Sequence, residues 1–425
     1  MKVAMFVRND MTVDARILKE AGSLRDAGHG VTIFGITRPG APREIEREPR
    51  DGFEIVRVPL PQYRRWWRWL RAPSRLWSMI RSRSLHAREG ARMDGLDWLA
   101  MWRFGTLGWA RDAARLAGEA DVYHGHDLTG LPAALIARRL HRPSARLIYD
   151  SHELYVDSTA TVGRPSWAVN WLRRKEREWS AEADALVTVS DGYADHLRPR
   201  IGIERVVVVH NCPPRPIGPM TRTTLVRDAL GLPAETRVVI YTGGLRVGRG
   251  IEVLARAMLE PGLEAVHLAF LGFGPLARDV EAMAADPAFG GRVHLLPPVP
   301  PLDVVRWVSS VDVAGMAIEA TNRSYELSTP NKMFEAFTAG VPVAGSDFPG
   351  FRAIVAENPE GPLGELFDPA SPASIAAAIR RILDLAPAAY DAMAERAHRA
   401  AVERWNWETE AAKLVALYRD LEAER

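Results

Sequence analysis

Short apolar runs recur along the chain and alternate with segments in which apolar residues keep helical spacing. The first runs cover residues 3–7 and 31–34, and between them Ile17, Leu18, Ala21 and Leu24 predict a helix within 13–27. Similar runs follow at 53–58, 121–124, 146–149, 185–189 and 206–209. Apolar strands that alternate with helices predict a parallel sheet covered by helices on both faces.

A proline-rich segment then interrupts the alternation. Four prolines lie within residues 211–219, which neither a strand nor a helix tolerates. The alternation restarts with apolar runs at 238–241, 266–271, 293–296, 311–316 and 341–344. We therefore expect two doubly wound α/β domains, 1–212 and 213–403, with a final helix at about 404–425 packing back on the first. Ligands of such sheets bind at the carboxyl ends of the strands.

The composition is that of a folded globular protein. Hydrophobic residues make up 47% and charged residues 25%, which argues against disorder, and a net charge of +2 requires no nucleic acid partner. Cys212 is the one cysteine, so an internal disulfide is impossible and a cysteine-based metal site is very unlikely. The apolar run at the N-terminus is too short for a signal peptide, and no apolar stretch approaches the length of a membrane span. We expect a cytoplasmic protein.

Residues 62–83 differ from the rest of the chain. They contain seven arginines, no acidic residue and several tryptophans, among them Trp66, Trp67 and Trp69. Basic residues mixed with tryptophan are typical of a segment that lies on a membrane surface. Two interpretations stay open: contact with a membrane or a lipid-bearing acceptor, or a loop and helix whose tryptophans pack on their own domain.

Residues 241–250 combine glycines with cations at a strand-to-helix turn. Gly243 and Gly244 let the backbone approach a ligand, and a helix is expected from about residue 251. Arg246 and Arg249 add permanent positive charge, so the turn is a candidate diphosphate site. The alternative is a glycine-rich turn with solvated arginines.

A second candidate donor segment covers residues 324–340. Pro330 suits the first turn of a helix, and Met333, Phe334 and Phe337 are expected to face the core. Glu335 lies on another part of that helix, where a carboxylate facing a ligand can accept both hydroxyls of a ribose. The alternative for Glu335 is an ordinary solvated glutamate.

Polar residues follow three strands of the first domain. They are candidates because the carboxyl ends of parallel strands meet at one edge of a sheet. The alternative for each histidine is a packed or surface residue, and Asp14 and Arg16 are weaker candidates. The group consists of Arg8, Asn9, Asp10, His126, Asp127, Asp150, His152 and Glu153.

Taken together and in order, these segments resemble glycosyltransferase family 4. The resemblance covers nearly the whole chain and includes VYHGHD, LIYDSHELY, YTGGLRVGRGIEVL, LAFLGFGPL and PNKMFEAFTAGVPVAGSD. It implies a GT-B fold of two facing Rossmann-like domains with a cleft between them. It also implies a UDP- or GDP-sugar donor on the second domain and a glycan or lipid-linked acceptor on the first. Retention of configuration is usual in this family, neither a metal nor another cofactor is required, and assembly of cell-envelope polysaccharide is a typical setting.

By position, the resemblance assigns roles to individual residues. Glu335 binds the ribose and Arg249 the diphosphate, and His152 approaches the reacting sugar. Further candidates are His126, Asp127 and Glu326 on the catalytic side and Gly272, Thr329, Asn331 and Lys332 on the donor side.

The chain departs from the family pattern at two positions. Gly244 stands where a second basic residue is usual, and Arg246 is the candidate substitute. Leu327 stands where the first glutamate of a pair is usual, with Glu326 beside it. Two rival interpretations therefore stay open: a nucleotide-sugar epimerase of similar architecture, and a non-catalytic scaffold at a membrane surface.

The chemistry favours transfer over hydrolysis. A nucleoside diphosphate is already a good leaving group, so positive charge at its phosphates is needed more than a pair of carboxylic acids. A dinucleotide oxidoreductase is disfavoured, because residues 7–11 lack the Gly-x-Gly fingerprint after the first strand.

Overall fold

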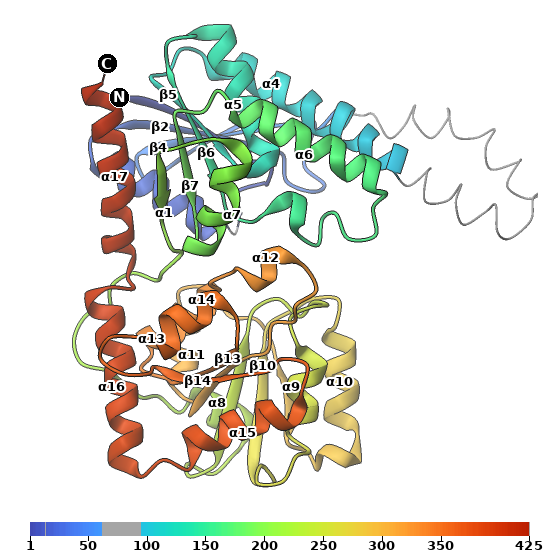
Figure 1. Ribbon diagram of the computed structural model, residues 1–425, viewed down its shortest axis with the longest axis vertical. Coiled ribbons are helices and arrows are strands. Elements are labelled where there is room, and N and C mark those ends of the chain that lie inside the picture. The colour runs from blue at the N-terminus through green and yellow to red at the C-terminus, as the bar shows by residue number, and fades with distance from the viewer. Residues whose placement is uncertain (13, 62–94, 425) are drawn as a thin grey trace, which may run out of the picture. The chain divides into compact units, whose positions relative to one another are not determined.

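The computed structural model describes residues 1–12, 14–61 and 95–424 of the chain. They form two compact units (Figure 1). The first contains Met1–Val189, Tyr193–Val209 and Lys413–Arg425, and the second contains Ser190–Gly192 and His210–Ala412. The division falls at Val209 where the sequence suggested 212, and the chain rejoins the first unit at Lys413, later than the expected 404. Residues 62–83, the arginine and tryptophan segment, lie outside the described residues.

The described part of the first unit contains an eight-stranded sheet in the order β3-β4-β2-β1-β5-β6-β7-β8. All neighbours are parallel except β3 and β4. The strands are β1 (Lys2–Phe6), β2 (Gly30–Ile36), β3 (Glu46–Arg50), β4 (Phe53–Val58), β5 (Val122–His126), β6 (Arg146–Ser151), β7 (Ala185–Thr188) and β8 (Val206–Val208).

Strand β3 was not predicted. Its sequence EREPR has no apolar run, and its antiparallel place at the sheet edge lets charged side chains and Pro49 face outward without breaking a central ladder.

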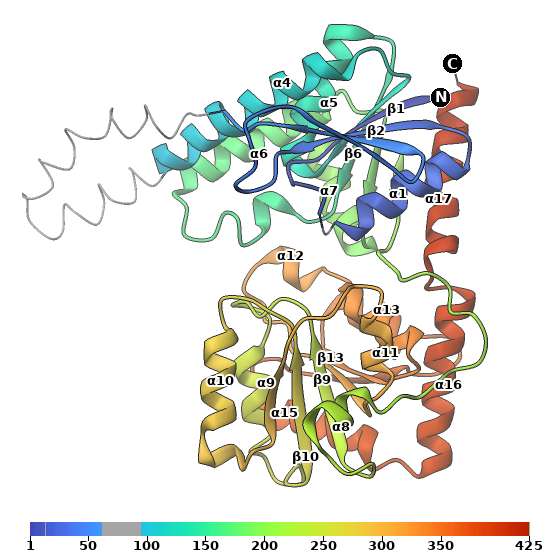
Figure 2. The same cartoon turned by 180° about the vertical axis from the view of Figure 1, so that it is seen from behind.

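Helices cover this sheet, as Figures 1 and 2 show from opposite sides. Helix α1 packs against β2 and β4 and buries Ile17, Ala21 and Leu24 of the predicted helical pattern, while the fourth residue of that pattern, Leu18, is half-buried. Helices α4 and α5 pack on each other, and α5 also contacts α6. The helices are α1 (Ala15–Asp26), α4 (Leu107–Ala117), α5 (Asp127–His141), α6 (Ser166–Ser180), α7 (Asp191–Ile201) and α17 (Trp407–Ala423), with a π-helical turn at Met101–Thr106 and a 3-10 turn at Tyr155–Asp157.

The second unit contains a six-stranded parallel sheet within the described residues, in the order β11-β10-β9-β12-β13-β14. The edge strand β14 was not predicted, because GELF is too short to give a pattern. The strands are β9 (Arg237–Thr242), β10 (Val266–Leu271), β11 (Val293–Leu296), β12 (Val313–Met316), β13 (Val343–Ser346) and β14 (Gly364–Phe367). The prediction of two doubly wound α/β domains is confirmed.

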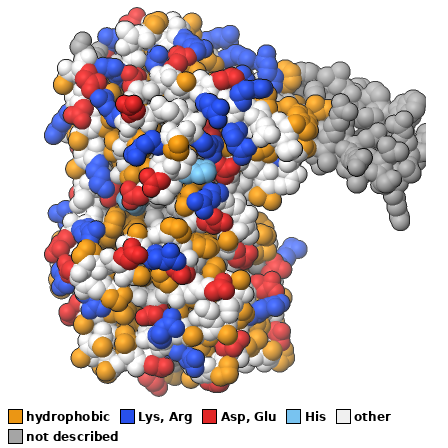
Figure 3. All heavy atoms as spheres, viewed as in Figure 1, with side chains coloured by type: hydrophobic (Ala, Val, Ile, Leu, Met, Phe, Trp, Pro, Cys, Tyr) orange, Lys and Arg blue, Asp and Glu red, His pale blue; other side chains and the backbone are white. Residues whose placement is uncertain are grey.

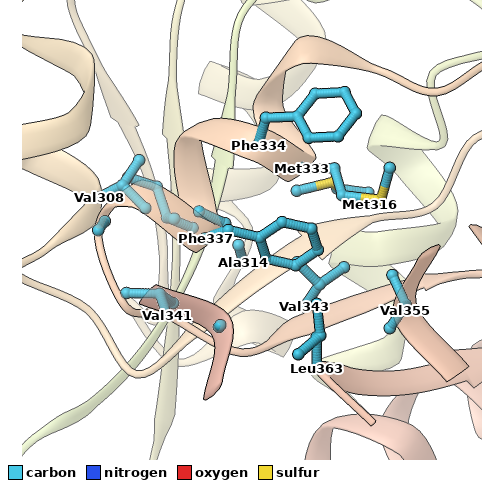
Figure 4. Close-up of a cluster of buried hydrophobic side chains, with 14 of the residues drawn as sticks. Val308, Ala314, Met316, Met333, Phe334, Phe337, Val341, Val343, Val355 and Leu363 are labelled. Atoms are coloured by element: carbon cyan, nitrogen blue, oxygen red, sulfur yellow. The ribbon is translucent and has the colours of Figure 1, made fainter. Parts of the chain in front are cut away.

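Two hydrophobic clusters fill the second unit. One packs α9, α10 and α15 against the sheet, and the other packs α8, α11, α13 and α16. Figure 4 shows Met333, Phe334 and Phe337 of α13 within the latter, as their spacing predicted. The helices are α8 (Leu225–Leu230), α9 (Ile251–Ala257), α10 (Ala277–Ala285), α11 (Val304–Val308), α12 (Arg323–Glu326), α13 (Asn331–Thr338), α14 (Pro349–Phe351), α15 (Pro372–Leu383) and α16 (Pro387–Glu403), with a 3-10 turn at Pro287–Phe289 and a π-helical turn at Arg352–Ala356.

Each sheet has a point where the strand order reverses. In the first it lies between β1 and its neighbours β2 and β5, and in the second between β9 and its neighbours β10 and β12. Open α/β sheets bind ligands beside such points, at the carboxyl ends of the strands. Residues 8–10, 127 and 243–250 follow those strand ends, whereas His126, expected just past its strand, is the last residue of β5. None of the helices within the described residues is both long and apolar enough to cross a bilayer.

Two helical glycines in the first unit give a matched test of packing. A Cβ at Gly130 of α5 would lie 2.2 Å from the carbonyl oxygen of Phe6, so α5 can approach β1 this closely only with glycine there. A Cβ at Gly22 of α1 would meet nothing within 4 Å. We expect Gly130→Ala to lower the free energy of unfolding by about 2 kcal/mol or more, as overpacking does. Gly22→Ala should raise it by roughly 0.5–1 kcal/mol through helix propensity. Denaturant unfolding monitored by circular dichroism measures both, and equal effects would contradict the close contact.

Candidate functional site

A glycine turn follows β9 in the second unit. Gly243 has a φ of 98°, which favours glycine, and its amide donates to the carbonyl of Leu271. A Cβ at Gly272 would lie 2.0 Å from the carbonyl oxygen of Gly243, so the loop after β10 also requires glycine where it touches the turn. The two loops thus form one surface of backbone at the strand ends.

Two basic side chains lie on tyrosine rings beside this turn. The guanidinium carbon of Arg249 is 4.3 Å from the ring centre of Tyr325, and Nζ of Lys332 is 3.6 Å from that of Tyr241. Tyr241 is fixed in turn, because its hydroxyl donates to the carbonyl of Gly244 at 2.9 Å. Aromatic faces attract cations without neutralising them.

Lys332 supplies a basic group close to the turn. Its Nζ lies 3.8 Å from the place that a Cβ of Gly243 would occupy. Loss of water, and then repulsion from Arg249, lower the pKa of Lys332 well below its usual 10.5, while Glu335 opposes this shift. Arg246, the predicted substitute for a basic residue at 244, is exposed and lies over Gly244.

The other donor-side candidates are spread along the following segment. Glu335 is half-buried on α13, one turn after Lys332, whose pKa it influences. Thr329 is buried, and Asn331 is exposed at the start of α13. The structure thus brings Gly243, Gly272, Arg249, Lys332 and Glu335 to one region of the second unit. The sequence did not identify the rings of Tyr241 and Tyr325 as part of the site, although both tyrosines lie within the two candidate donor segments.

Glu326 has a different neighbourhood. It lies on α12 and accepts a hydrogen bond of 2.7 Å from Arg323 of the same helix. Leu327, in the place of the usual glutamate, is only 5% exposed and belongs to the apolar interior. Neither position contributes an unpaired carboxylate to the glycine turn.

A buried polar cluster lies at the carboxyl ends of β5 and β6 in the first unit. The rings of His124 and His126 share one face of β5 and stack at 4.3 Å. Asp150 lies opposite His126 on β6. Its Oδ2 is 3.4 Å from Nε2 of His124, 3.5 Å from Nδ1 of His126 and 3.3 Å from Nε2 of His152. One carboxylate therefore faces three imidazoles.

Helices α1 and α17 complete the cluster. Arg16 of α1 lies 2.8 Å from Glu20 and 3.6 Å from Asp150, and its Nη1 donates to the carbonyl of Val209. The hydroxyl of Tyr418 on α17 is 2.8 Å from Nδ1 of His124. Period-two spacing in VYHGH could have identified His124, whereas Glu20 and Tyr418 come from distant helices and carry no local signal.

The cluster fixes the charge of its members. Burial opposes the protonation of His152, but Asp150 and Asp127 raise its pKa to about 10, so this imidazole carries a charge at neutral pH. Burial and its neighbour His124 lower the pKa of His126 to about 3. Burial and Asp150 raise the pKa of Glu20 to about 8.

His152 and Asp127 are the members nearest to solvent, with side chains 16% and 25% exposed. Asp127 accepts a hydrogen bond from the backbone amide of His152 at 3.0 Å. It also has a φ of 54°, a left-handed conformation that costs a non-glycine residue about 1 kcal/mol or more. A strained carboxylate beside an imidazolium, at the reversal point of the sheet, is the part of the cluster that a ligand can reach.

The same cluster contains four side chains of the metal-ligating type. The four ligand atoms, one from each residue, all lie within 4.8 Å of one another, and they belong to Glu20, His124, His126 and Asp150. The guanidinium of Arg16 lies against both carboxylates and already balances part of their charge. We assign no metal here, and the expectation of a metal-independent enzyme stays a prediction.

The remaining acceptor-side candidates are mostly engaged in holding loops. Asn9 donates to Asp14 at 2.6 Å, and Asp14 caps α1. Asp10 accepts from the amide and hydroxyl of Thr12. Arg8 and Glu153 are half-buried at the same sheet edge. Asn9 and Asp10 therefore shape the loop after β1.

Comparison with known proteins identifies the chain. The family described as "Glycosyl transferase 4-like domain" matches residues 12–212, and that described as "Glycosyl transferases group 1" matches residues 236–385. The D-inositol 3-phosphate glycosyltransferase of Xylanimonas cellulosilytica is 30% identical over 326 residues, covering 72% of this chain and 73% of that protein. The chain belongs to glycosyltransferase family 4.

Solved structures agree on the architecture of this glycosyltransferase. Sucrose-phosphate synthase from Thermosynechococcus elongatus matches with a TM-score of 0.73 and 19% identity over 100% of both chains. Anabaena HepE in complex with UDP and glucose matches with a TM-score of 0.68 and 14% identity, covering 99% of this chain and 100% of that one. The expected GT-B fold is thereby confirmed.

The charge of His152 gives a prediction about pH. The folded protein holds a proton on His152 up to about pH 10, whereas the unfolded chain releases it near 6.5. The stability that this proton contributes is full below pH 6.5 and is lost as the pH rises towards 10. We expect the wild type to lose about 1 kcal/mol or more of unfolding free energy between pH 6.5 and 9 relative to His152→Gln. Urea unfolding at both pH values measures the difference, and parallel pH profiles would rule out a raised pKa.

Proposed function

We propose that this glycosyltransferase moves a sugar from a UDP- or GDP-sugar to a hydroxyl of a glycan or lipid-linked acceptor. The observation that carries the donor assignment is the pair Arg249 and Lys332 on tyrosine rings beside the Gly243 turn. Neither forms an ion pair with a described residue, so both remain available to an anion. Glu335 on the same helix as Lys332 is the proposed ligand of the ribose hydroxyls.

Charge is what this donor requires. When the bond between the sugar and the diphosphate breaks, negative charge develops on the leaving phosphate, and cations held in place stabilise it without reorganisation. Arg249 is always charged, and an approaching diphosphate favours the charged form of Lys332, whose pKa is lowered without it. These side chains supply the charge that metal-dependent transferases take from a divalent ion, which supports metal-independent transfer.

The first unit is the proposed acceptor side. His152 can donate a hydrogen bond from its charged ring, and Asp127 beside it can accept one from an attacking hydroxyl. Asp150, Arg16 and Glu20 are buried behind His152 and hold its charge. Retention of the sugar's configuration is part of the proposal and is supported by membership of family 4.

The Xylanimonas relative is named a D-inositol 3-phosphate glycosyltransferase, so its name contains a phosphorylated inositol. A hydroxyl acceptor that carries a phosphate is therefore a further candidate for this chain, and it would benefit from the positive charge of His152.

The carboxylate of Glu335 provides the test of the donor site. Hydrogen bonds to a charged group contribute about 1.5–3 kcal/mol each, so Glu335→Ala should weaken UDP or GDP binding at least about tenfold in calorimetry. Glu252→Ala is the matched control, since Glu252 is exposed on α9 and pairs only with Arg256 in the described structure. It should bind as the wild type does.

Unchanged binding by folded Glu335→Ala would show that the donor site is assigned wrongly. Incubating the wild type with the nucleotide sugar alone, without an acceptor, distinguishes a transferase from a nucleotide-sugar epimerase. An altered nucleotide sugar formed without an acceptor would indicate an epimerase in place of a transferase.

A further inference from the structure

A groove lies between α4, α5 and α6 of the first unit, and none of its residues belongs to the candidate site. Its volume is about 450 Å³, which is within the range of small-molecule sites. Among the residues that line it, Leu135, Ile136, Trp171 and Trp179 provide an apolar wall. The ring of Trp179 rests against buried Trp102, with ring centres 6.1 Å apart, so the wall is supported from below.

Basic side chains surround this apolar wall, and none of the described residues that line the groove is acidic. Two of the four basic residues are balanced by neighbours, Arg139 by Glu182 and Lys175 by Glu178. The other two form no ion pair with a described residue. The four are Arg103, Arg111, Arg139 and Lys175. Figure 3 shows Lys and Arg side chains gathered over the part of this unit where α4 and α6 lie.

The ligand that fits such a groove is amphiphilic and anionic. A free anion would leave the tryptophans and Ile136 in water, and an uncharged apolar ligand would leave the charges of Arg103 and Arg111 without a counter-ion among the described residues. A phosphate on an acyl chain satisfies both, because arginines bind phosphate oxygens and tryptophans favour the boundary between headgroups and hydrocarbon. Anionic membrane surfaces attract such basic groups further.

We propose that this groove binds an anionic phospholipid of a membrane surface. The phosphate lies at Arg103 and Arg111, and an acyl chain lies along Trp171 and Trp179. This inference goes beyond the proposed function, since it needs neither the donor residues nor the acceptor side. It is also independent of the arginine and tryptophan segment, whose residues lie outside the described structure.

A water-soluble lipid tests the groove without a bilayer. Dihexanoyl phosphatidylglycerol, kept below its micelle concentration, should bind to the full chain in calorimetry. We expect the double variant Arg103→Gln with Arg111→Gln to bind it at least tenfold more weakly. Arg115→Gln is the matched control, because Arg115 lies on the same helix α4 but is 68% exposed and pairs with Asp112 at 3.2 Å. It should bind as the wild type does.

Three outcomes would overturn the proposal: equal binding by the double variant, equal binding of dihexanoyl phosphatidylcholine, or equal binding of glycerol phosphate without acyl chains. The last would indicate a simple phosphate site. UDP or GDP binding measured on the same samples shows that the double variant is folded. It also separates failure of the groove from failure of the donor site.

Discussion

The proposed donor site of this glycosyltransferase depends on two basic side chains that tyrosine rings hold beside a glycine turn. A carboxylate in the same place would neutralise them, and open water would leave them mobile. The rings of Tyr241 and Tyr325 position Lys332 and Arg249 while leaving their charge for a ligand. The turn can come this close only because glycines stand at 243 and 272.

The polar cluster of the first unit differs from the donor site, because most of its charged groups are buried and paired with one another. Asp150 faces three histidines and Arg16, and it stays ionised despite its burial because His152 and Arg16 lower its pKa. Glu20 pairs with Arg16, but burial and the charge of Asp150 still raise its pKa. Removing one partner would leave an uncompensated buried charge, which is strongly destabilising. The result is a single imidazolium, His152, presented at the sheet edge with Asp127.

Much of this organisation follows from the order of residues, and the exceptions have physical causes. Apolar runs predicted the central strands of both sheets, because buried parallel strands leave a continuous apolar pattern. The edge strands β3 and β14, with the sequences EREPR and GELF, show no such apolar pattern. The candidate site shows the same division: Arg249 and Glu335 were identified within motifs, whereas the contact between Lys332 and Tyr241 joins segments about 90 residues apart. Glu20 and Tyr418 likewise join the histidines only through the fold.

The central claim is that Lys332 and Arg249 hold the diphosphate, and proton uptake on binding tests it most directly. Lys332 has a lowered pKa that an arriving diphosphate must raise, while an arginine at 332 is charged throughout. Calorimetry of UDP or GDP binding at pH 8.5, in two buffers of different ionisation enthalpy, counts the protons taken up. The account predicts uptake by the wild type that is absent from Lys332→Arg, with binding retained by both. Equal proton counts for the two proteins would contradict it.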